Sequence, residues 1–151
     1  MKPTLHRMAR PVPTLDYERE LMATGARIIA GMDEVGRGAI AGPVTIGVVA
    51  IDATIGAVPE GLADSKLMTI KRREAMVPVA KEWGLAWATG SATAAEIDKY
   101  GIMSALGLAG SRALAALGVV PDVIILDGNN SFLMEEDNGP RVITRVKADQ
   151  N

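Results

Sequence analysis

The stretch from residue 28 to residue 51, IIAGMDEVGRGAIAGPVTIGVVAI, decides the fold. Residues 27–32 form a short apolar run that ends directly before two acids, and this pattern predicts a buried strand. Residues 43–51 are rich in β-branched side chains and predict a second strand. Because Gly38 and Gly42 lie in the short link between the two runs, we expect a hairpin with antiparallel strands.

The rest of the chain predicts further elements around this hairpin. We expect helices at residues 14–23 (capped by Thr14), 69–83 (capped by Thr69, with a kink at Pro78) and 94–117 (two helices broken near Gly101), and strands at 85–91, 123–126 and 141–146. Residues 123–126 are wholly apolar, which is typical of a strand buried on both faces. The very apolar second helix of 94–117 should lie flat against a sheet.

The order of these elements predicts a single domain of the α/β or α+β class over residues 14–151, and we take α/β as the fold class. Residues 1–13 contain three prolines and are interpreted as a flexible N-terminal arm.

Composition excludes several classes of function. The chain has 151 residues, no cysteine and one histidine, His6. This excludes disulfides and cysteine nucleophiles, and it argues against a histidine-based zinc site or a Ser-His-Asp triad. The net charge of −2 does not by itself indicate a nucleic-acid or membrane partner. The most apolar stretch, 102–120, carries Arg112, whereas a membrane helix needs about 20 apolar residues with few or no charges. We therefore expect a cytoplasmic protein with no membrane partner.

Acidic residues follow two of the predicted buried strands. Asp33 and Glu34 follow residues 27–32, and Asp127 follows residues 123–126. Folds of the α/β class place ligands at such strand ends. A set of carboxylates with no His or Cys nearby suits Mg²⁺ or Mn²⁺, and such ions support phosphoryl chemistry by activating water and stabilising a leaving oxygen. Because side chains alternate along a strand, the strand must break at these acids for Asp33 and Glu34 to reach one site.

A rival motif occupies the same turn. Residues 36–41, GRGAIA, match the dinucleotide fingerprint G-x-G-x-x-A. That fingerprint requires a helix to begin at the glycines, so that the helix N-terminus can hold a pyrophosphate. Because Pro43 and a β-branched segment follow instead, we expect a strand there. The alternative function, a nucleotide-binding oxidoreductase, is rejected on this ground.

Four segments, taken together, resemble the ribonuclease HII family. They are residues 30–44 (AGMDEVGRGAIAGPV), Asp64-Ser65-Lys66, Leu126-Asp127-Gly128-Asn129 and Val146-Lys147-Ala148-Asp149, and they come in the order of that family. The first segment is long and specific. The resemblance implies a ribonuclease H-like fold, a mixed sheet flanked by helices. It also implies metal-dependent endonucleolytic cleavage of RNA in RNA–DNA hybrids and at single ribonucleotides embedded in duplex DNA.

The resemblance further implies roles for particular residues. The metal-binding catalytic acids, with Mg²⁺ or Mn²⁺ as cofactor, would be Asp33, Glu34 and Asp127. The segment Gly36-Arg37-Gly38 would contact the ribose 2′-hydroxyl, where the lack of a Cβ lets the backbone approach and where RNA differs from DNA. Ser65 and Lys66 would bind backbone phosphate. The expected partner is an RNA–DNA hybrid or a ribonucleotide-containing duplex DNA, bound by a monomer.

The chain departs from the family pattern at its C-terminal end. The usual Lys-Gly-Asp is Lys147-Ala148-Asp149 here, and the chain stops at Asn151. The resemblance implies that the family's C-terminal segment, with a fourth active-site acid, is missing. Asp137 and Asp149 are interpreted as loop residues and not as replacements for that acid. The alternative to an active endonuclease is therefore a catalytically silent fragment of the same fold that binds hybrid duplexes.

Overall fold

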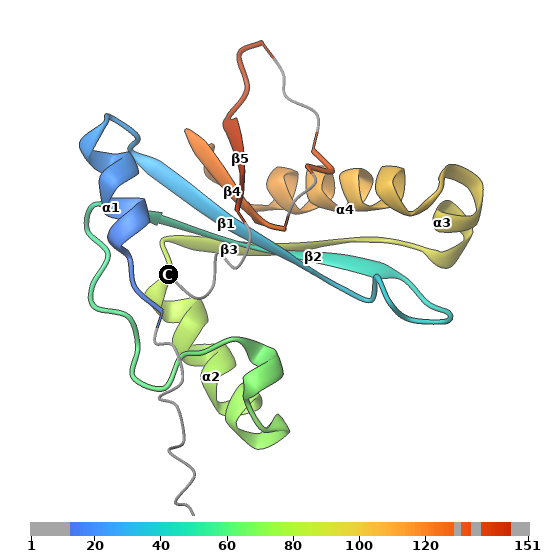
Figure 1. The fold of residues 1–151 in the computed structure, drawn as a ribbon, viewed down its shortest axis with the longest axis horizontal. Helices are drawn as coiled ribbons and strands as arrows, with labels where there is room; N and C mark the ends of the chain where they lie inside the picture. Colours follow the sequence, from blue (N-terminus) through green and yellow to red (C-terminus); the bar gives the residue numbers. More distant parts are fainter. Residues whose placement is uncertain (1–12, 129–130, 134–136, 146–151) are drawn as a thin grey trace, which may run out of the picture.

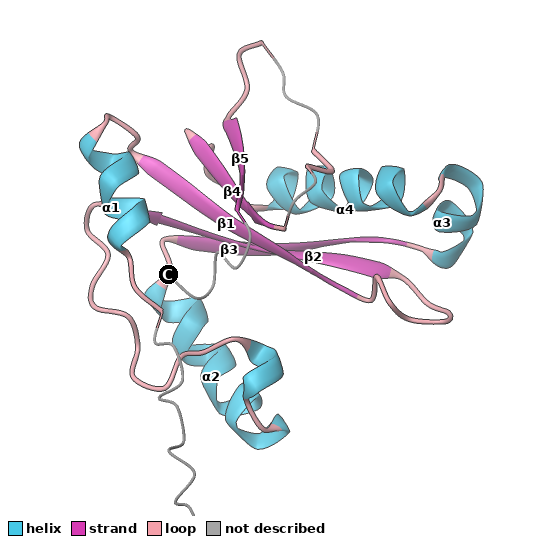
Figure 2. Ribbon diagram, in the orientation of Figure 1, coloured by secondary structure: helices cyan, strands magenta, loops and turns pink. Residues whose placement is uncertain are grey.

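The computed structural model describes residues 13–128, 131–133 and 137–145. These residues form a five-stranded mixed sheet with helices on both faces (Figures 1 and 2). The strands are β1 (Ile28–Val35), β2 (Val44–Asp52), β3 (Ala86–Ala92), β4 (Val123–Asp127) and β5 (Arg141–Arg145). The α-helices are α1 (Asp16–Ala23), α2 (Ile70–Trp83), α3 (Ala94–Tyr100) and α4 (Ile102–Ala116). A short 3₁₀ helix, η1 (Ser65–Leu67), precedes α2. The predicted class, a single α/β domain with a mixed sheet flanked by helices, is confirmed.

The β1–β2 hairpin lies at the centre of the sheet, whose strand order is β3-β2-β1-β4-β5. Strands β1 and β2 are antiparallel, as predicted, with Asp33 opposite Gly47. Strand β3 is antiparallel to β2, whereas β4 runs parallel to β1 and β5 runs parallel to β4. Because the link of residues 36–43 leads into β2 and not into a helix, the dinucleotide fingerprint lacks the context it needs.

The larger hydrophobic core lies between the sheet and α4. Buried side chains of this helix, such as Leu106 and Ala109, pack against Ile46 of β2 and Ile124 of β4. The prediction that this apolar helix lies flat on the sheet is confirmed. The predicted break at Gly101 is confirmed too, because this glycine separates α3 from α4 with a φ of +81°. Such a backbone conformation suits a residue without a side chain.

A smaller core covers the opposite face of the sheet. Its buried members come from α1 and its flanking residues and from β1, β2 and β4: Leu15, Leu21, Ile29, Ile51, Val123 and Ile125. Strand β4 thus sends Val123 and Ile125 into this core, and its alternate residues into the larger one. The prediction of a strand buried on both faces is confirmed.

The helix starts were predicted with unequal success. Thr69 caps α2 as expected, because its hydroxyl accepts a hydrogen bond of 3.3 Å from the backbone N–H of Arg72. The predicted cap at Thr14 is wrong: α1 begins at Asp16, with Leu15 at the N-cap position and no capping side chain. Leu15 is buried in the smaller core, and this burial replaces a polar cap in setting the start of the helix.

Some predictions fall on residues outside the described ranges. They concern the N-terminal arm up to residue 12, Asn129, and the segment Val146-Lys147-Ala148-Asp149. No helix among the described residues is long and apolar enough to cross a membrane.

Candidate active site

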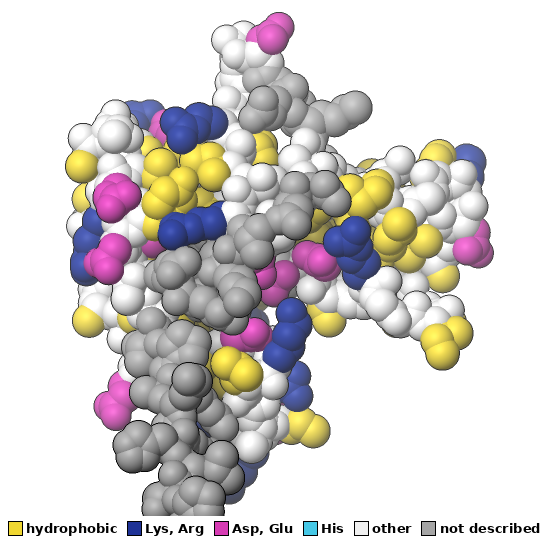
Figure 3. Space-filling model, viewed as in Figure 1, with side chains coloured by type: hydrophobic (Ala, Val, Ile, Leu, Met, Phe, Trp, Pro, Cys, Tyr) yellow, Lys and Arg dark blue, Asp and Glu magenta, His cyan; other side chains and the backbone are white. Residues whose placement is uncertain are grey.

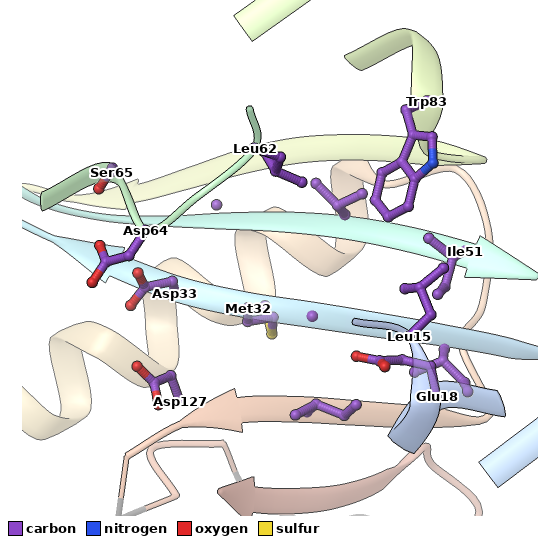
Figure 4. A pocket seen from close by; sticks show the side chains of 15 residues that line it. Leu15, Glu18, Met32, Asp33, Ile51, Leu62, Asp64, Ser65, Trp83 and Asp127 are labelled. Carbon is purple, nitrogen blue, oxygen red and sulfur yellow. The ribbon is translucent and has the colours of Figure 1, made fainter. Parts of the chain in front are cut away.

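Asp33 and Asp127 lie beside each other on neighbouring strands. Met32 of β1 is paired with Leu126 of β4, and these strands run parallel. The next residue on each strand is therefore an aspartate, and both point to the face of the smaller core. The two carboxylates line a cleft of about 570 Å³, and they gather at one end of it (Figure 4).

A third acid, Asp64, lies in the same cleft and was not predicted to do so. It precedes η1, and its Oδ1 accepts a hydrogen bond of 2.9 Å from the backbone N–H of Lys66. Figure 4 shows the Asp64 carboxyl close to that of Asp33, on a loop that crosses over the sheet. The sequence signal for its position was the motif Asp64-Ser65-Lys66, because an Asp side chain often accepts a hydrogen bond from the backbone two residues further on and so forms a turn. Sequence reasoning assigned functions only to the Ser and the Lys.

Burial and charge act together on Asp33. Partial burial raises the pKa of its carboxyl above the ordinary value, and the nearby carboxylates of Glu34 and Asp127 raise it further. The backbone N–H of Glu34, which donates to Asp33 Oδ1 at 2.8 Å, and the ammonium of Lys66 lower this pKa. A bound cation offsets the repulsion between like charges that raises such a pKa. An oxygen-only donor set of this kind fits a hard divalent ion.

Glu34 lies on the other face of the sheet. The expectation that the strand breaks at the acids is wrong, because β1 continues to Val35 and pairs with β2 along its whole length. Side-chain alternation therefore separates Glu34 from Asp33. The Glu34 Oε1 lies 3.6 Å from Nη1 of Arg37. In the part of the chain that is described, no group of three His, Asp or Glu residues lies close enough to hold a metal ion.

The turn after β1 depends on its first glycine. Gly36 has a φ of +93°, and a Cβ at this position would lie 2.5 Å from the carbonyl oxygen of Pro43. Its own carbonyl accepts a hydrogen bond of 3.1 Å from the backbone N–H of Ala39. A side chain at Gly38, by contrast, would meet open space. Gly36 is thus required by the turn, whereas Gly38 leaves its backbone accessible.

Arg37 joins this turn to α4. Its Nη2 donates to the sulfur of Met103 at 3.8 Å, while its Nη1 faces Glu34. Ser65 and Lys66 lie on the other side of the site: Ser65 lines the cleft, and both side chains are exposed on η1. The residues predicted to bind substrate therefore flank the two aspartates.

Two glycines keep the floor of the cleft open. Gly47 of β2 is opposite Asp33 of β1, and Gly31 lies two residues before Asp33 on β1. A Cβ at either position would meet nothing within 4 Å. At the far end the cleft is apolar, and it contains Glu18 Oε2 and Trp83 Nε1, which have no hydrogen-bond partner among the described residues. Burial raises the pKa of Glu18.

Comparison with solved structures identifies the class of fold. The chain resembles the crystal structure of the ribonuclease H2 from Pyrococcus horikoshii OT3, with a TM-score of 0.63 and 28% identity over 82% of this chain and 64% of that chain. It also resembles Bst-RNase HIII crystallised in complex with Mn²⁺, with a TM-score of 0.57 and 21% identity over 82% of this chain and 46% of that chain. The fold is that of the ribonuclease H2 and HIII enzymes.

Comparison of sequences narrows this class to one family. The family model for ribonuclease HII matches residues 30–151. The ribonuclease HII of Streptomyces avermitilis is 49% identical over 141 residues, which are 92% of this chain and 58% of the relative. The ribonuclease HII of Paracoccus denitrificans is 46% identical over 117 residues, which are 78% of this chain and 54% of the relative. The chain belongs to the ribonuclease HII family, and it spans less than two thirds of the length of these relatives.

Proposed function

We propose that this chain carries the catalytic cleft of a metal-dependent endonuclease. Its substrates are RNA in RNA–DNA hybrids and single ribonucleotides embedded in duplex DNA. The observation that carries the proposal is the pair of carboxylates of Asp33 and Asp127 at one end of an open cleft, in a chain of the ribonuclease HII family. The Mn²⁺ complex of Bst-RNase HIII, a structural neighbour, supports a divalent ion as the cofactor.

The acids of the cleft would hold Mg²⁺ or Mn²⁺. Asp33 and Asp127 are the proposed ligands, with Asp64 within the same cleft. When bound, such an ion supplies Lewis acidity for attack of water on a phosphodiester. The contribution of the chain is to present two neighbouring carboxylates; burial raises the pKa of Asp33 and the charge of Asp127 adds to this effect, which a bound cation would offset.

Glu34 is proposed as a further acid of this site. Strand β1 pairs with β4 only as far as Met32, so the residues of β1 after Met32 have no paired strand on that side among the described residues. We propose that the last residues of β1 rotate when Arg37 leaves Glu34 to contact substrate, which brings the Glu34 carboxyl towards Asp127. In this structure side-chain alternation along β1 places Glu34 on the other face, where its Oε1 lies 3.6 Å from Nη1 of Arg37.

The residues that flank the acids would select and hold the nucleic acid. The backbone at Gly36-Arg37-Gly38 is proposed to contact the ribose 2′-hydroxyl, because the side-chain-free Gly38 is open to an approaching sugar. Ser65 and Lys66 are proposed to hold a phosphate, since Lys66 is a cation close enough to Asp33 to lower its pKa. A cation beside the acids can hold the phosphate that follows the cleaved bond.

Cleavage of a duplex that contains one ribonucleotide tests this function. With Mg²⁺ or Mn²⁺ the wild-type chain should cleave it, and Asp33→Asn and Asp127→Asn should each reduce cleavage to background. Asp98→Asn, at an exposed acid on α3, is the matched control and should cleave like the wild type. Hybrid binding without any cleavage by the wild-type chain would favour the alternative, a catalytically silent fragment. Cleavage by Asp33→Asn at the wild-type rate would remove Asp33 from the mechanism.

A further inference from the structure

Segment 65–81, which contains η1 and most of α2, carries an excess of positive charge. It has five basic residues and one acidic residue, Glu74, in a chain whose net charge is −2. No side chain of α2 is buried. None of the five basic residues forms an ion pair with a carboxylate of the described residues. Ion pairing within the described residues therefore does not account for these charges.

The charges of α2 are sorted between two flanks of the helix. At 3.6 residues per turn, Arg73, Val77 and Lys81 follow one another along a single flank. Lys71 lies eleven residues before Glu82, which places these two charges on another flank, while Glu74 lies seven residues before Lys81 and borders the first flank. Arg72 points towards the loop at Gly61, because its guanidinium would lie 3.4 Å from a Cβ at that position. The flank of Arg73 and Lys81 thus carries two cations, with Glu74 at its border.

Contacts at the end of this flank place it beside the cleft. Lys81 Nζ lies 3.8 Å from the ring centroid of Trp87 on β3. Trp87 is opposite Val49 of β2, which lines the cleft, so both side chains point to the same face as Asp33. At the other end, Lys66 acts electrostatically on Asp33. Figure 3 shows Lys and Arg side chains along η1 and α2, next to acidic side chains nearer the sheet.

We propose that Arg73 and Lys81, here named the α2 basic flank, bind phosphates of a nucleic-acid duplex whose cleaved bond lies at Asp33 and Asp127, and so extend the phosphate contact of Lys66 along α2. This inference rests on the proposed function and extends it. Arg73 and Lys81 are eight residues apart, about 12 Å along the helix, so they contact different phosphates. The flank would hold the nucleic-acid strand where it leaves the acidic end of the cleft and passes over β3, the edge strand of the sheet. Because the contacts are to phosphate, they fix position and carry no sequence preference.

Salt dependence of binding tests the α2 basic flank. The probe is a short RNA–DNA hybrid, bound by the whole chain in EDTA so that no cleavage occurs, over a series of NaCl concentrations. Arg73→Gln/Lys81→Gln should lower the slope of log Kd against log[NaCl] by about 1.8, because each lost phosphate contact removes about 0.9. Lys71→Gln/Lys99→Gln removes the same charge from elsewhere and should keep the wild-type slope. Arg73→Lys/Lys81→Arg retains both charges and should keep it too.

The outcomes separate this surface from the proposed function. If the wild-type chain binds the hybrid with a steep slope, and the Arg73→Gln/Lys81→Gln variant has the slope of the control, the α2 basic flank is refuted and the proposed function stands. If the wild-type chain binds no duplex at any salt concentration, both fail. Thermal melts of all variants show that they are folded, and an unfolded double Gln variant is replaced by the two single variants, each with an expected loss of about 0.9 in slope.

Discussion

Replacement of Gly90 by alanine tests the packing that supports the cleft. Gly90 lies in β3, and a Cβ at this position would collide with the backbone of α4, at the carbonyl oxygen of Ala109 and the amide nitrogen of Ala113. The nearby carbonyl carbon of Arg112 would lie at 2.9 Å. Because backbone atoms cannot rotate away as a side chain can, α4 must shift from the sheet. Overpacking of this kind costs about 1–3 kcal/mol and occasionally more.

Gly47→Ala is the matched control on the neighbouring strand. A Cβ at Gly47 meets nothing within 4 Å, and alanine in a strand interior is more stable than glycine by about 0.5–1 kcal/mol. For a chain of 151 residues, 1 kcal/mol corresponds to about 3 °C in Tm. Gly90→Ala should therefore melt about 3–9 °C below the wild type, while Gly47→Ala melts at or slightly above it. Equal melting temperatures for Gly90→Ala and the wild type would refute the close approach of α4 to β3.

Three further predictions follow from the site and its surroundings. Without divalent ions, Asp33→Asn should melt at the same temperature as the wild type or higher, because it removes a carboxylate whose pKa is raised by burial and by neighbouring acids; Mg²⁺ should then stabilise the wild type more than the variant. The hydrogen bonds from Arg112 lower the pKa of Glu96 from 4.5 to about 2, so this ion pair stabilises the fold fully above pH 4.5, and its contribution is lost as the pH falls towards 2. Denaturation curves of the wild type and Glu96→Gln should therefore differ most at neutral pH and converge in acid; a constant difference would contradict this role. Finally, if the backbone at Gly36-Arg37-Gly38 contacts a 2′-hydroxyl, an all-DNA duplex should be cleaved more slowly than its single-ribonucleotide counterpart by roughly 10⁴–10⁵, and comparable rates would refute the assignment.

Local signals in the sequence predicted most of the fold. The Thr69 cap, the break at Gly101 and the apolar run of β4 each act within a few residues, so their consequences could be derived without knowledge of the tertiary structure. The start of α1 could not, because the burial of Leu15 depends on strands that lie far away in the sequence. The burial of Leu15 in the tertiary structure, and not the capping preference of Thr14, sets where α1 begins.

The candidate site was predicted only in part, for a similar reason. Asp33 and Asp127 were predicted together because each ends an apolar run, and β1 and β4 do lie side by side. The position of Glu34 depends on how far β1 stays paired with β2, which the acidic residues themselves do not indicate. Asp64 reaches the cleft through the path of the loop before η1. No periodic pattern reports the path of such a loop.

Direct measurement of Mn²⁺ binding tests the central claim, that Asp33 and Asp127 together hold a divalent cation. Calorimetric titration of the wild-type chain should show binding that is greatly weakened in Asp33→Asn and in Asp127→Asn, and unchanged in the control Asp98→Asn. The measurement does not depend on catalytic activity. Binding of equal affinity in the wild type and both cleft variants would contradict the claim that these two carboxylates form the metal site.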